Sequence, residues 1–332
     1  MSKVRPTTAP TDEGVGKAAV SAVIVNWNCG ANLRRCIDAI KKSRHVTIAE
    51  IIVVDNASSD GSVATVQEVE GVRVIQTGSN LGYGGGANRG LRGARSEWVM
   101  ILNPDVVLDE DAIERMVSYL DAEPECGLVG PRLLDASGSE PGSCGGRPVL
   151  LDAIGRKFLL HMIFPYFNFR LQRPDFPTEV GWVTGACTVA RRSALDSVGG
   201  FDEAIFMYFE DLDLSLRLRQ GGWKVCFLPE AVGCHVGGES SKQVLDRMLL
   251  ASEVSYRYFT RKHFGAVASG LLILLTPVEM ALRSALWGTI YIFFTGRRRE
   301  ARTRLRAYLK AFLNDFDEAA PPTRPANIES QL

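Results

Sequence analysis

The stretch Glu50-Ile-Ile-Val-Val-Asp55 carries four consecutive β-branched apolar residues and ends on an acid. Such a short apolar run predicts a strand that is buried on both faces. A second run of strand length lies at Val20–Asn26, and residues 32–42 between the two place apolar side chains on one helical face. Strand, helix and strand in this order predict two parallel strands joined by a crossover helix.

The same alternation continues along the chain. A short helix is expected at residues 63–69, and a glycine-rich loop that opens a helix at residues 80–90. The pattern also predicts further strands, at residues 72–76, 97–102, 180–190 and 223–228. Repeated units of this kind predict an α/β fold, a doubly wound and mostly parallel sheet with helices on both faces.

Polar side chains stand where three of these strands end: Asn26, Asp55 and the segment Asn103-Pro104-Asp105. Ligands of doubly wound sheets bind beyond the carboxyl ends of the strands. Asp and Asn also begin ordinary loops, so each residue alone has two interpretations. Three strand ends together favour a site, and the oxygen ligands of Asn103 and Asp105 suit Mg²⁺ shared with substrate phosphates.

Two other segments fit an anionic ligand. Glycines in residues 80–90 allow backbone N–H groups at a helix start to approach an anion, although a flexible surface turn has the same composition. His235 offers a nitrogen ligand, which would admit Mn²⁺ as well as Mg²⁺. The alternative for His235 is a structural histidine.

The segment Phe206–Leu214 places three carboxylates, Glu210, Asp211 and Asp213, among large apolar side chains. Buried carboxylates need a partner, so the cluster is either paired or held for a charged ligand or for proton transfer. A helix start is the other interpretation, since acids favour the first turn and Asp213 lies four residues before Arg217. The two interpretations are compatible.

The bulk composition is that of a globular protein. The 332 residues are 46% hydrophobic and 23% charged, and the formal net charge is zero, which gives no general attraction for nucleic acid. Seven cysteines without a CxxC pair indicate reduced thiols. Residues 1–18 and 319–332 are polar or rich in Pro and are expected to be flexible tails, leaving a main domain at 19–240 and a helical region at 241–318.

The helical region is apolar and then basic. Residues 265–294 approach the length that spans a bilayer, but Pro277 breaks the tract and Glu279 and Arg283 charge its middle, so a helical hairpin or surface-lying helices are expected. Residues 297–306 hold six arginines, a composition typical of contact with anionic lipid on the cytoplasmic side. A solvated helix packed on its own domain is the alternative.

Several motifs in the same order carry a resemblance to a known family. They are IVNWN at the first strand, VVDNASSDGS, NLGYGGGANRG, ILNPDV, TGAC, GGFDE, FMYFEDLDLSLRLRQ and the late CHVGG. From about Val20 to His235 the chain resembles family 2 glycosyltransferases of the Rossmann-like GT-A fold, especially bacterial rhamnosyltransferase-like members.

The resemblance implies roles for the candidate residues. Asp211 is similar to the general base and Glu210 to a residue that orients the base or contacts the acceptor. Asp105 would bind the metal with His235 as second ligand. The remaining matches would contact the sugar donor: Asn26, Asp55, Asn88, Arg89 and Asn103. Many relatives have Asp-x-Asp where this chain has Asn103-Pro104-Asp105, which implies weaker metal binding because an amide oxygen is a poorer ligand.

The resemblance also implies an activity and a location. The expected reaction is an inverting transfer, most simply of L-rhamnose from dTDP-rhamnose to a lipid-linked or polysaccharide acceptor, with Mg²⁺ or Mn²⁺ and without nucleic acid. Other nucleotide sugars, such as UDP-galactofuranose, UDP-glucose or UDP-GlcNAc, and a non-catalytic nucleotide-sugar-binding protein remain alternatives. The expected place is the cytoplasmic face of a bacterial inner membrane, held peripherally or monotopically, and a homo-oligomer stays open.

Overall fold

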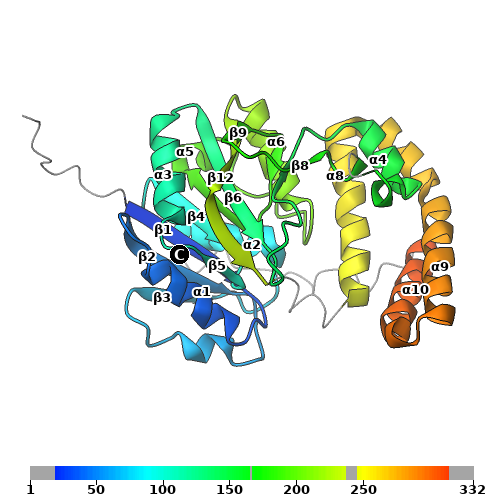
Figure 1. Cartoon of the computed structure of the whole chain (residues 1–332), viewed down its shortest axis with the longest axis horizontal. Helices are drawn as coiled ribbons and strands as arrows, with labels where there is room; N and C mark the ends of the chain where they lie inside the picture. The colour runs from blue at the N-terminus through cyan, green and yellow to red at the C-terminus, as the bar shows by residue number, and fades with distance from the viewer. Residues whose placement is uncertain (1–18, 165–166, 237–244, 314–332) are drawn as a thin grey trace, which may run out of the picture.

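The structure, a computed structural model, describes residues 19–164, 167–236 and 245–313 (Figure 1). The two predicted tails, the boundary at residue 240 and the end of the CHVGG motif lie outside these residues.

Strands and helices alternate through the first two thirds of the chain. The strands are β1 (Ala19–Asn26), β2 (Thr47–Asp55), β3 (Val72–Gln76), β4 (Trp98–Leu102), β5 (Val106–Leu108), β6 (Cys126–Leu134), β7 (Cys144–Gly145), β8 (Leu171–Gln172), β9 (Thr178–Glu179), β10 (Trp182–Val183), β11 (Cys187–Arg191) and β12 (Lys224–His235). The helices are α1 (Asn32–Lys41), α2 (Gly82–Gly93), α3 (Ala112–Ala122), α4 (Leu150–Lys157), α5 (Arg192–Ser197), α6 (Glu210–Gln220), α8 (Leu245–Leu274), α9 (Thr276–Phe293) and α10 (Arg298–Phe312). Short 3-10 turns are η1 (Ser62–Thr65), η2 (Leu160–Met162) and η4 (Thr295–Arg297).

The main sheet has the order β3-β2-β1-β4-β11-β6-β12-β5, with β9 paired to β12. β3, β2, β1 and β4 are parallel neighbours, and β12 is parallel to β6. β11 runs antiparallel to both β4 and β6, so it begins at the edge where its neighbours end. The predicted mostly parallel α/β sheet is confirmed, with this reversed strand inserted in its middle.

Two helical layers cover the sheet, as the alternating side chains of β1 show. Val20, Ala22 and Ile24 belong to a core cluster with residues of α1 and α3. Val23 and Val25 belong to another, with residues of α2, α5 and α6. Each face of the strand is therefore buried, which is why its sequence is continuously apolar.

The helix that the glycine-rich segment was predicted to open is present, and it already begins at Gly82, so most of the glycines lie inside α2. An added Cβ at Gly90 would lie 2.2 Å from the side chain of Val23, and one at Gly86 would lie 2.7 Å from Val25. The glycines therefore allow α2 to pack closely on β1. The helix predicted at 63–69 is shorter, a 3-10 turn over Ser62–Thr65.

The C-terminal helices lie together beside the sheet domain (Figure 1). α8 bends at Gly265, whose φ of 85° is in the left-handed region. Within the described part of the chain, no single helix is long and apolar enough to cross a membrane, whereas the pair formed by residues 247–274 and 276–293, bent by 45°, reaches that length and composition.

The charges inside the apolar tract are paired in the interior. Lys157 of α4, with its side chain 1% exposed, places Nζ 2.8 Å from Glu279 and 3.6 Å from Glu253. Arg283 lies 2.8 Å from Glu279 on the same helix. Helix α4, although it precedes β11 and β12 in the chain, is thereby joined to α8 and α9.

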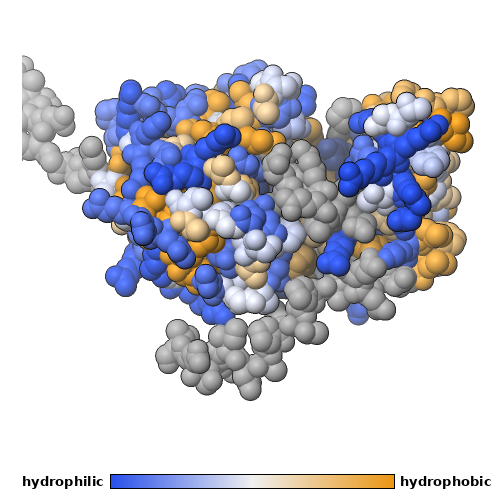
Figure 2. Space-filling view, turned by 90° about the horizontal axis from the view of Figure 1, so that it is seen from below, coloured by the Kyte–Doolittle hydropathy of each residue, from blue (hydrophilic) through white to orange (hydrophobic). Residues whose placement is uncertain are grey.

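Large apolar side chains remain exposed on this helical part. Figure 2 shows them along its outer margin. The exposed set includes Ile163 of the segment after η2, Leu274 at the end of α8 and Phe293 at the end of α9, which are 72%, 76% and 73% exposed. Phe158, Met162 and Phe164 are exposed as well, so the apolar residues 158–164 lie largely at the surface.

Candidate active site

A cavity of about 350 Å³ opens at the edge where β1, β2, β4 and β12 end. Its walls come from separate parts of the sequence: the ends of these strands, the start of α2, the segment before β11, the loop before α6, and the first turn of α6. The lining residues include Trp27, Asn56, Tyr83, Asn103, Asp105, Gly185, Tyr208, Glu210, Asp211 and His235.

Asp105 and His235 meet at one wall of the cavity. Asp105 Oδ1 lies 3.2 Å from His235 Nε2, and Asn103 Nδ2 lies 3.4 Å from the same nitrogen. The approach is built by the sheet, because β5, which begins just after Asp105, pairs antiparallel with the end of β12. The backbone N–H of Val236 donates to the carbonyl oxygen of Asp105 and locks this register.

This pair fits a divalent cation. Neighbouring ligands on a six-coordinate ion with bonds of about 2.1 Å are separated by roughly 3 Å, close to the Asp105–His235 separation. In the described part of the chain no group of three His, Cys, Asp or Glu side chains gathers for a metal. Asp105 and His235 would thus hold the ion from one side only, and Mg²⁺ sites of this kind take further ligands from substrate phosphates and water.

Glu210 and Asp211 lie at the start of α6, on another wall of the cavity, and a constrained turn precedes this helix. Tyr208 and Phe209 both have positive φ, 63° and 70°. Such a conformation is unfavourable for bulky residues and is maintained only where the surroundings impose it. The helix then begins at Glu210, as the acid-rich segment predicted.

Hydrogen bonds orient Asp211 in the cavity. Its Oδ2 accepts from the backbone N–H of Gly185 at 2.9 Å, and its Oδ1 accepts from the N–H of Leu212 at 2.8 Å. Burial nevertheless raises the pKa of Asp211, because desolvation outweighs these two stabilising contacts. A carboxylate with a raised pKa is a better base than one in water.

Glu210 is almost fully buried beside it. Burial, with the negative charge of Asp211 as a smaller cause, raises the pKa of Glu210 to about 8. Its Oε2 has no hydrogen-bond partner within the described structure. The two carboxyl groups therefore share one environment and compete for ionisation.

Asn26 and Asp55 have a different place. Asn26 is fully buried, and its Nδ2 donates to Asp55 Oδ1 at 3.2 Å, to Ser58 Oγ at 3.0 Å and to Ser62 Oγ at 2.9 Å. Both lie at paired positions of the two parallel strands. They shape the loop after β2, while the residues that follow each strand, Trp27 and Asn56, line the cavity.

Asn88 and Arg89 lie on α2, beyond the lining residues. Asn88 Nδ2 donates to the carbonyl oxygen of Phe201, and its Oδ1 accepts from the N–H of the same residue, both at 2.9 Å. It thus holds the loop before α6. Arg89 is partly buried on the same helix.

The first amide groups of α2 are already used. The N–H of Gly82 donates to Asn80 Oδ1 at 2.9 Å, and the N–H of Tyr83 donates to the carbonyl oxygen of Phe206 at 3.1 Å. These two groups are not free for the anion that the sequence predicted there.

Sequence reasoning missed several lining residues. Trp27 and Asn56 directly follow Asn26 and Asp55, so their position one residue past a strand end is the signal that they carry in the sequence. Tyr83 hydrogen-bonds through its hydroxyl to the carbonyl oxygen of Gly185 at 2.5 Å, a contact between segments a hundred residues apart. No local pattern signals it.

A sequence model described as glycosyl transferase family 2 matches residues 21–199, more than half of the chain. The chain belongs to glycosyl transferase family 2. The match runs from β1 to the end of α5 and so covers the strand ends that carry Asn103 and Asp105. The chain is thereby a glycosyltransferase.

Relatives of this glycosyltransferase include two proteins named as rhamnosyltransferases. The chain is 31% identical over 302 residues to the N-acetylglucosaminyl-diphospho-decaprenol L-rhamnosyltransferase of Mycobacterium tuberculosis, covering 85% of this chain and 95% of that protein. It is 26% identical over 231 residues to rhamnosyltransferase WbbL of Escherichia coli K12, covering 64% and 83%.

Solved structures agree on the GT-A fold. The mannosyltransferase PcManGT of Pyrobaculum calidifontis, in complex with GDP-Man and Mn²⁺, has a TM-score of 0.51 at 17% identity and is covered over 91% of its length, with 92% of this chain. GalNAc-T7, solved with UDP, GalNAc and Mn²⁺, has a TM-score of 0.53 at 17% identity, covering 74% of this chain and 50% of that one. At this identity the likeness concerns the fold alone.

Proposed function

We propose that this glycosyltransferase moves L-rhamnose from dTDP-rhamnose, with inversion, to a saccharide carried on polyprenyl diphosphate or to a similar cell-surface polysaccharide precursor. The two relatives described above, both named as rhamnosyltransferases, support this choice of sugar. The observation that carries the reaction type is the oriented, desolvated carboxylate of Asp211 in a cavity whose other wall holds Asp105 and His235.

Asp211 acts as the general base. It accepts the proton of the acceptor hydroxyl while that oxygen forms a bond to the anomeric carbon of the donor sugar. The bond from the anomeric carbon to the diphosphate oxygen breaks on the opposite face, and the electron pair leaves with the nucleoside diphosphate. The hydrogen bond from the Gly185 N–H to Oδ2 restricts rotation of the Asp211 carboxylate and so orients the group for proton transfer.

Asp105 and His235 would hold Mg²⁺ or Mn²⁺, with Asn103 beside them. A divalent cation there supplies positive charge to the diphosphate of the donor. The pairing of β5 with β12 holds Asp105 and His235 side by side, so the chain presents both ligands without rearrangement.

We further propose that the enzyme binds the cytoplasmic face of an anionic membrane through the tip of its helical part. The tip comprises Ile292 and Phe293 at the end of α9, Phe294 just after it, and the arginines Arg297–Arg299 that follow. The three apolar residues are 63%, 73% and 58% exposed. Exposed apolar side chains next to three exposed arginines complement a bilayer whose surface is negatively charged.

A donor panel tests the activity. Purified enzyme is incubated with dTDP-rhamnose, UDP-galactofuranose, UDP-glucose, UDP-GlcNAc or GDP-mannose and Mg²⁺ or Mn²⁺, with a polyprenyl-diphosphate saccharide as acceptor. We expect the midpoint of thermal unfolding to rise most with dTDP-rhamnose, because a ligand of the native state stabilises it, and sugar to appear on the lipid. Transfer only from another donor would refute the assignment of rhamnose. If a donor binds but is neither transferred nor hydrolysed, the proposed catalysis is refuted.

A further inference from the structure

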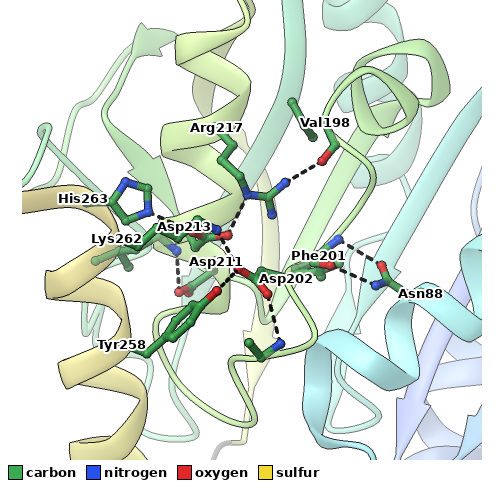
Figure 3. Close-up of polar contacts among 12 residues, drawn as sticks. Asn88, Val198, Phe201, Asp202, Asp211, Asp213, Arg217, Tyr258, Lys262 and His263 are labelled. Atoms are coloured by element: carbon green, nitrogen blue, oxygen red, sulfur yellow. Dashed lines mark hydrogen bonds and ion pairs between the residues drawn. The ribbon is translucent and has the colours of Figure 1, made fainter. Parts of the chain in front are cut away.

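The loop between α5 and α6 leads directly into the catalytic carboxylates, and two helices hold it from different sides. On one side, Asn88 of α2 bonds both backbone groups of Phe201. On the other side lies α8, from the C-terminal helical part (Figure 3). Met207 and Tyr208, near the end of this loop, line the cavity.

One side chain of α8 joins the loop to the catalytic helix. Lys262 Nζ lies 2.7 Å from Asp202 Oδ2, in the loop, and 2.6 Å from Asp213 Oδ1, on α6 (Figure 3). Tyr258, one turn earlier on α8, donates its hydroxyl to the same Asp202 oxygen at 2.9 Å. The two carboxylates thus share a cation that the C-terminal helical part supplies.

Asp213 is fully buried, so its charge needs these contacts. Arg217 Nε lies 2.7 Å from its Oδ2, and His263 Nε2 lies 2.8 Å from its Oδ1. Burial raises the pKa of Asp213, but the hydrogen bond with His263, the charge of Arg217 and the hydrogen bond with Lys262 outweigh it and lower the pKa to about 2. The group is therefore ionised, and two of its three partners come from α8.

Aromatic packing supplies a second, independent link. Phe209 is the left-handed residue immediately before Glu210. Its ring lies 5.5 Å from the rings of Tyr256 and Phe259, both on α8, and 5.6 Å from Phe169. The turn that sets the direction of α6 is therefore packed against the same helix that carries Lys262.

We propose that Lys262 is a positioning residue for sugar transfer: by bridging Asp202 and Asp213 it fixes the loop and the first turn of α6, and so places Asp211 and Tyr208 in the cavity. Lys262 does not line the cavity and acts only through these two carboxylates. The C-terminal helical part is then a component of the active site as well as a candidate membrane contact. This inference deepens the proposed function and rests on it for the role of Asp211.

The test compares K262M with the matched control R261M, which changes an exposed cation on the adjacent position of α8. Methionine keeps the length of the side chain and removes the charge. Amide hydrogen exchange, which needs no substrate, should show residues 199–214 exchanging about tenfold faster or more in K262M, with strands β1 and β4 unchanged. R261M should match the wild type throughout.

Steady-state kinetics give the second readout, with whichever nucleotide sugar the wild type turns over. We expect kcat of K262M to fall about ten- to a hundredfold, as misplacement of a catalytic group does, with KM for the donor within about twofold. D202A should lower kcat in the same way, and K262M/D202A should lose little more than K262M alone, because both changes break one bridge.

Equal exchange of residues 199–214 in K262M and R261M, or equal kcat in the two, would overturn the proposal. Additive losses in the double variant would overturn the bridge through Asp202. Should K262M not fold, D202A decides by the same two measurements, because Asp202 is partly exposed. Should no donor be turned over, the proposed function fails, whereas the exchange measurement still decides the role of Lys262.

Discussion

Asp211 Oδ2 accepts a hydrogen bond from the backbone N–H of Gly185 at 2.9 Å, which ties the first turn of α6 to the segment before β11. An added Cβ at Gly185 would lie 3.2 Å from Asp211 Cβ, so the approach depends on a small residue at this position. This hydrogen bond distinguishes Asp211 from Glu210, whose Oε2 has no partner in the described structure, and from Asp213, which is paired with Arg217 and Lys262.

Replacing Asp211 by Asn should lower sugar transfer by about 10²- to 10⁴-fold, because the amide keeps the shape but removes the base. Donor binding should survive, since the change is expected to act on the chemical step. The measurement is kcat for transfer together with the donor-induced rise in the thermal midpoint. D121N, at an exposed position of α3, is the matched control and should retain wild-type kcat; near-normal turnover of D211N would assign the base elsewhere.

The pH dependence of stability should reveal Glu210. Its pKa is raised from the usual 4.5 to about 8, so the folded state favours the protonated form. The contribution of protonated Glu210 to the free energy of unfolding is fully present below pH 4.5 and is lost as the pH rises through about 8. E210Q, which cannot ionise, should therefore gain stability relative to the wild type as the pH increases from 5 to 8.

Urea unfolding of E210Q at several pH values measures this difference. The exposed Glu68 offers a matched control, and E68Q should follow the wild type at every pH. If the difference in free energy of unfolding between E210Q and the wild type stays constant with pH, the pKa of Glu210 is not raised in the folded state.

Changes at the strand end after β4 should move metal affinity in opposite directions. D105N removes the carboxylate ligand beside His235 and should weaken Mn²⁺ binding about tenfold or more. N103D replaces an amide by a carboxylate and should strengthen it, because hard cations prefer charged oxygen ligands. Titration of Mn²⁺ in the presence of the nucleoside diphosphate, followed by electron paramagnetic resonance, gives both constants; weaker binding by N103D would exclude Asn103 from the site.

Vesicle binding tests the tip of the helical part. Replacing Arg297, Arg298 and Arg299 by Gln should reduce co-sedimentation with vesicles that contain phosphatidylglycerol, and added salt should reduce wild-type binding in the same way. Replacing Ile292, Phe293 and Phe294 by Ser should weaken binding even at low salt, since the apolar contribution is lost. Unchanged sedimentation of both triple variants would place the membrane contact elsewhere or remove it.

Lys157 should be needed for stability. K157M leaves Glu253 and Glu279 in the interior without their shared cation, a loss that typically costs about 3–5 kcal/mol. Urea unfolding should show this as a lower midpoint. K157M/E279Q, which also removes one of the buried acids, should recover part of the loss; a double variant no more stable than K157M would mean that the two charges are independent.

The first strands and the polar residues at their ends were predictable from the sequence because they depend on local composition, whereas the strand predicted at 180–190 is two strands, β10 and β11, and the one at 223–228 is the first half of β12. The strand predicted at Glu50–Asp55 is β2, which begins three residues earlier and ends at the same residue. The strand predicted at Val20–Asn26 is β1, which begins one residue earlier and also ends as predicted. The start of α6 at Glu210 and the pairing of Asp213 with Arg217 followed from the clustering of acids and the four-residue spacing.

Other features depend on contacts between distant segments. The glycines of residues 80–90 predicted a loop that opens a helix, whereas they lie inside α2, because their lack of a side chain allows close packing on β1. Asn26 and Asp55 bond to each other because their strands are neighbours in register, and this leaves the next residues facing the cavity. Lys262 gave no local signal, because its two partners lie about fifty and sixty residues away.

The reversed direction of β11 has a consequence for how enzymes of this architecture can diversify. β6 leaves the sheet at the cavity rim and β11 re-enters it at the same rim, so the intervening excursion, residues 135–186, starts and finishes beside the reaction centre. Residues 184–186 of this segment line the cavity, so a change in the length of its loops would alter one wall while the pairing of β1, β2 and β4 stays the same.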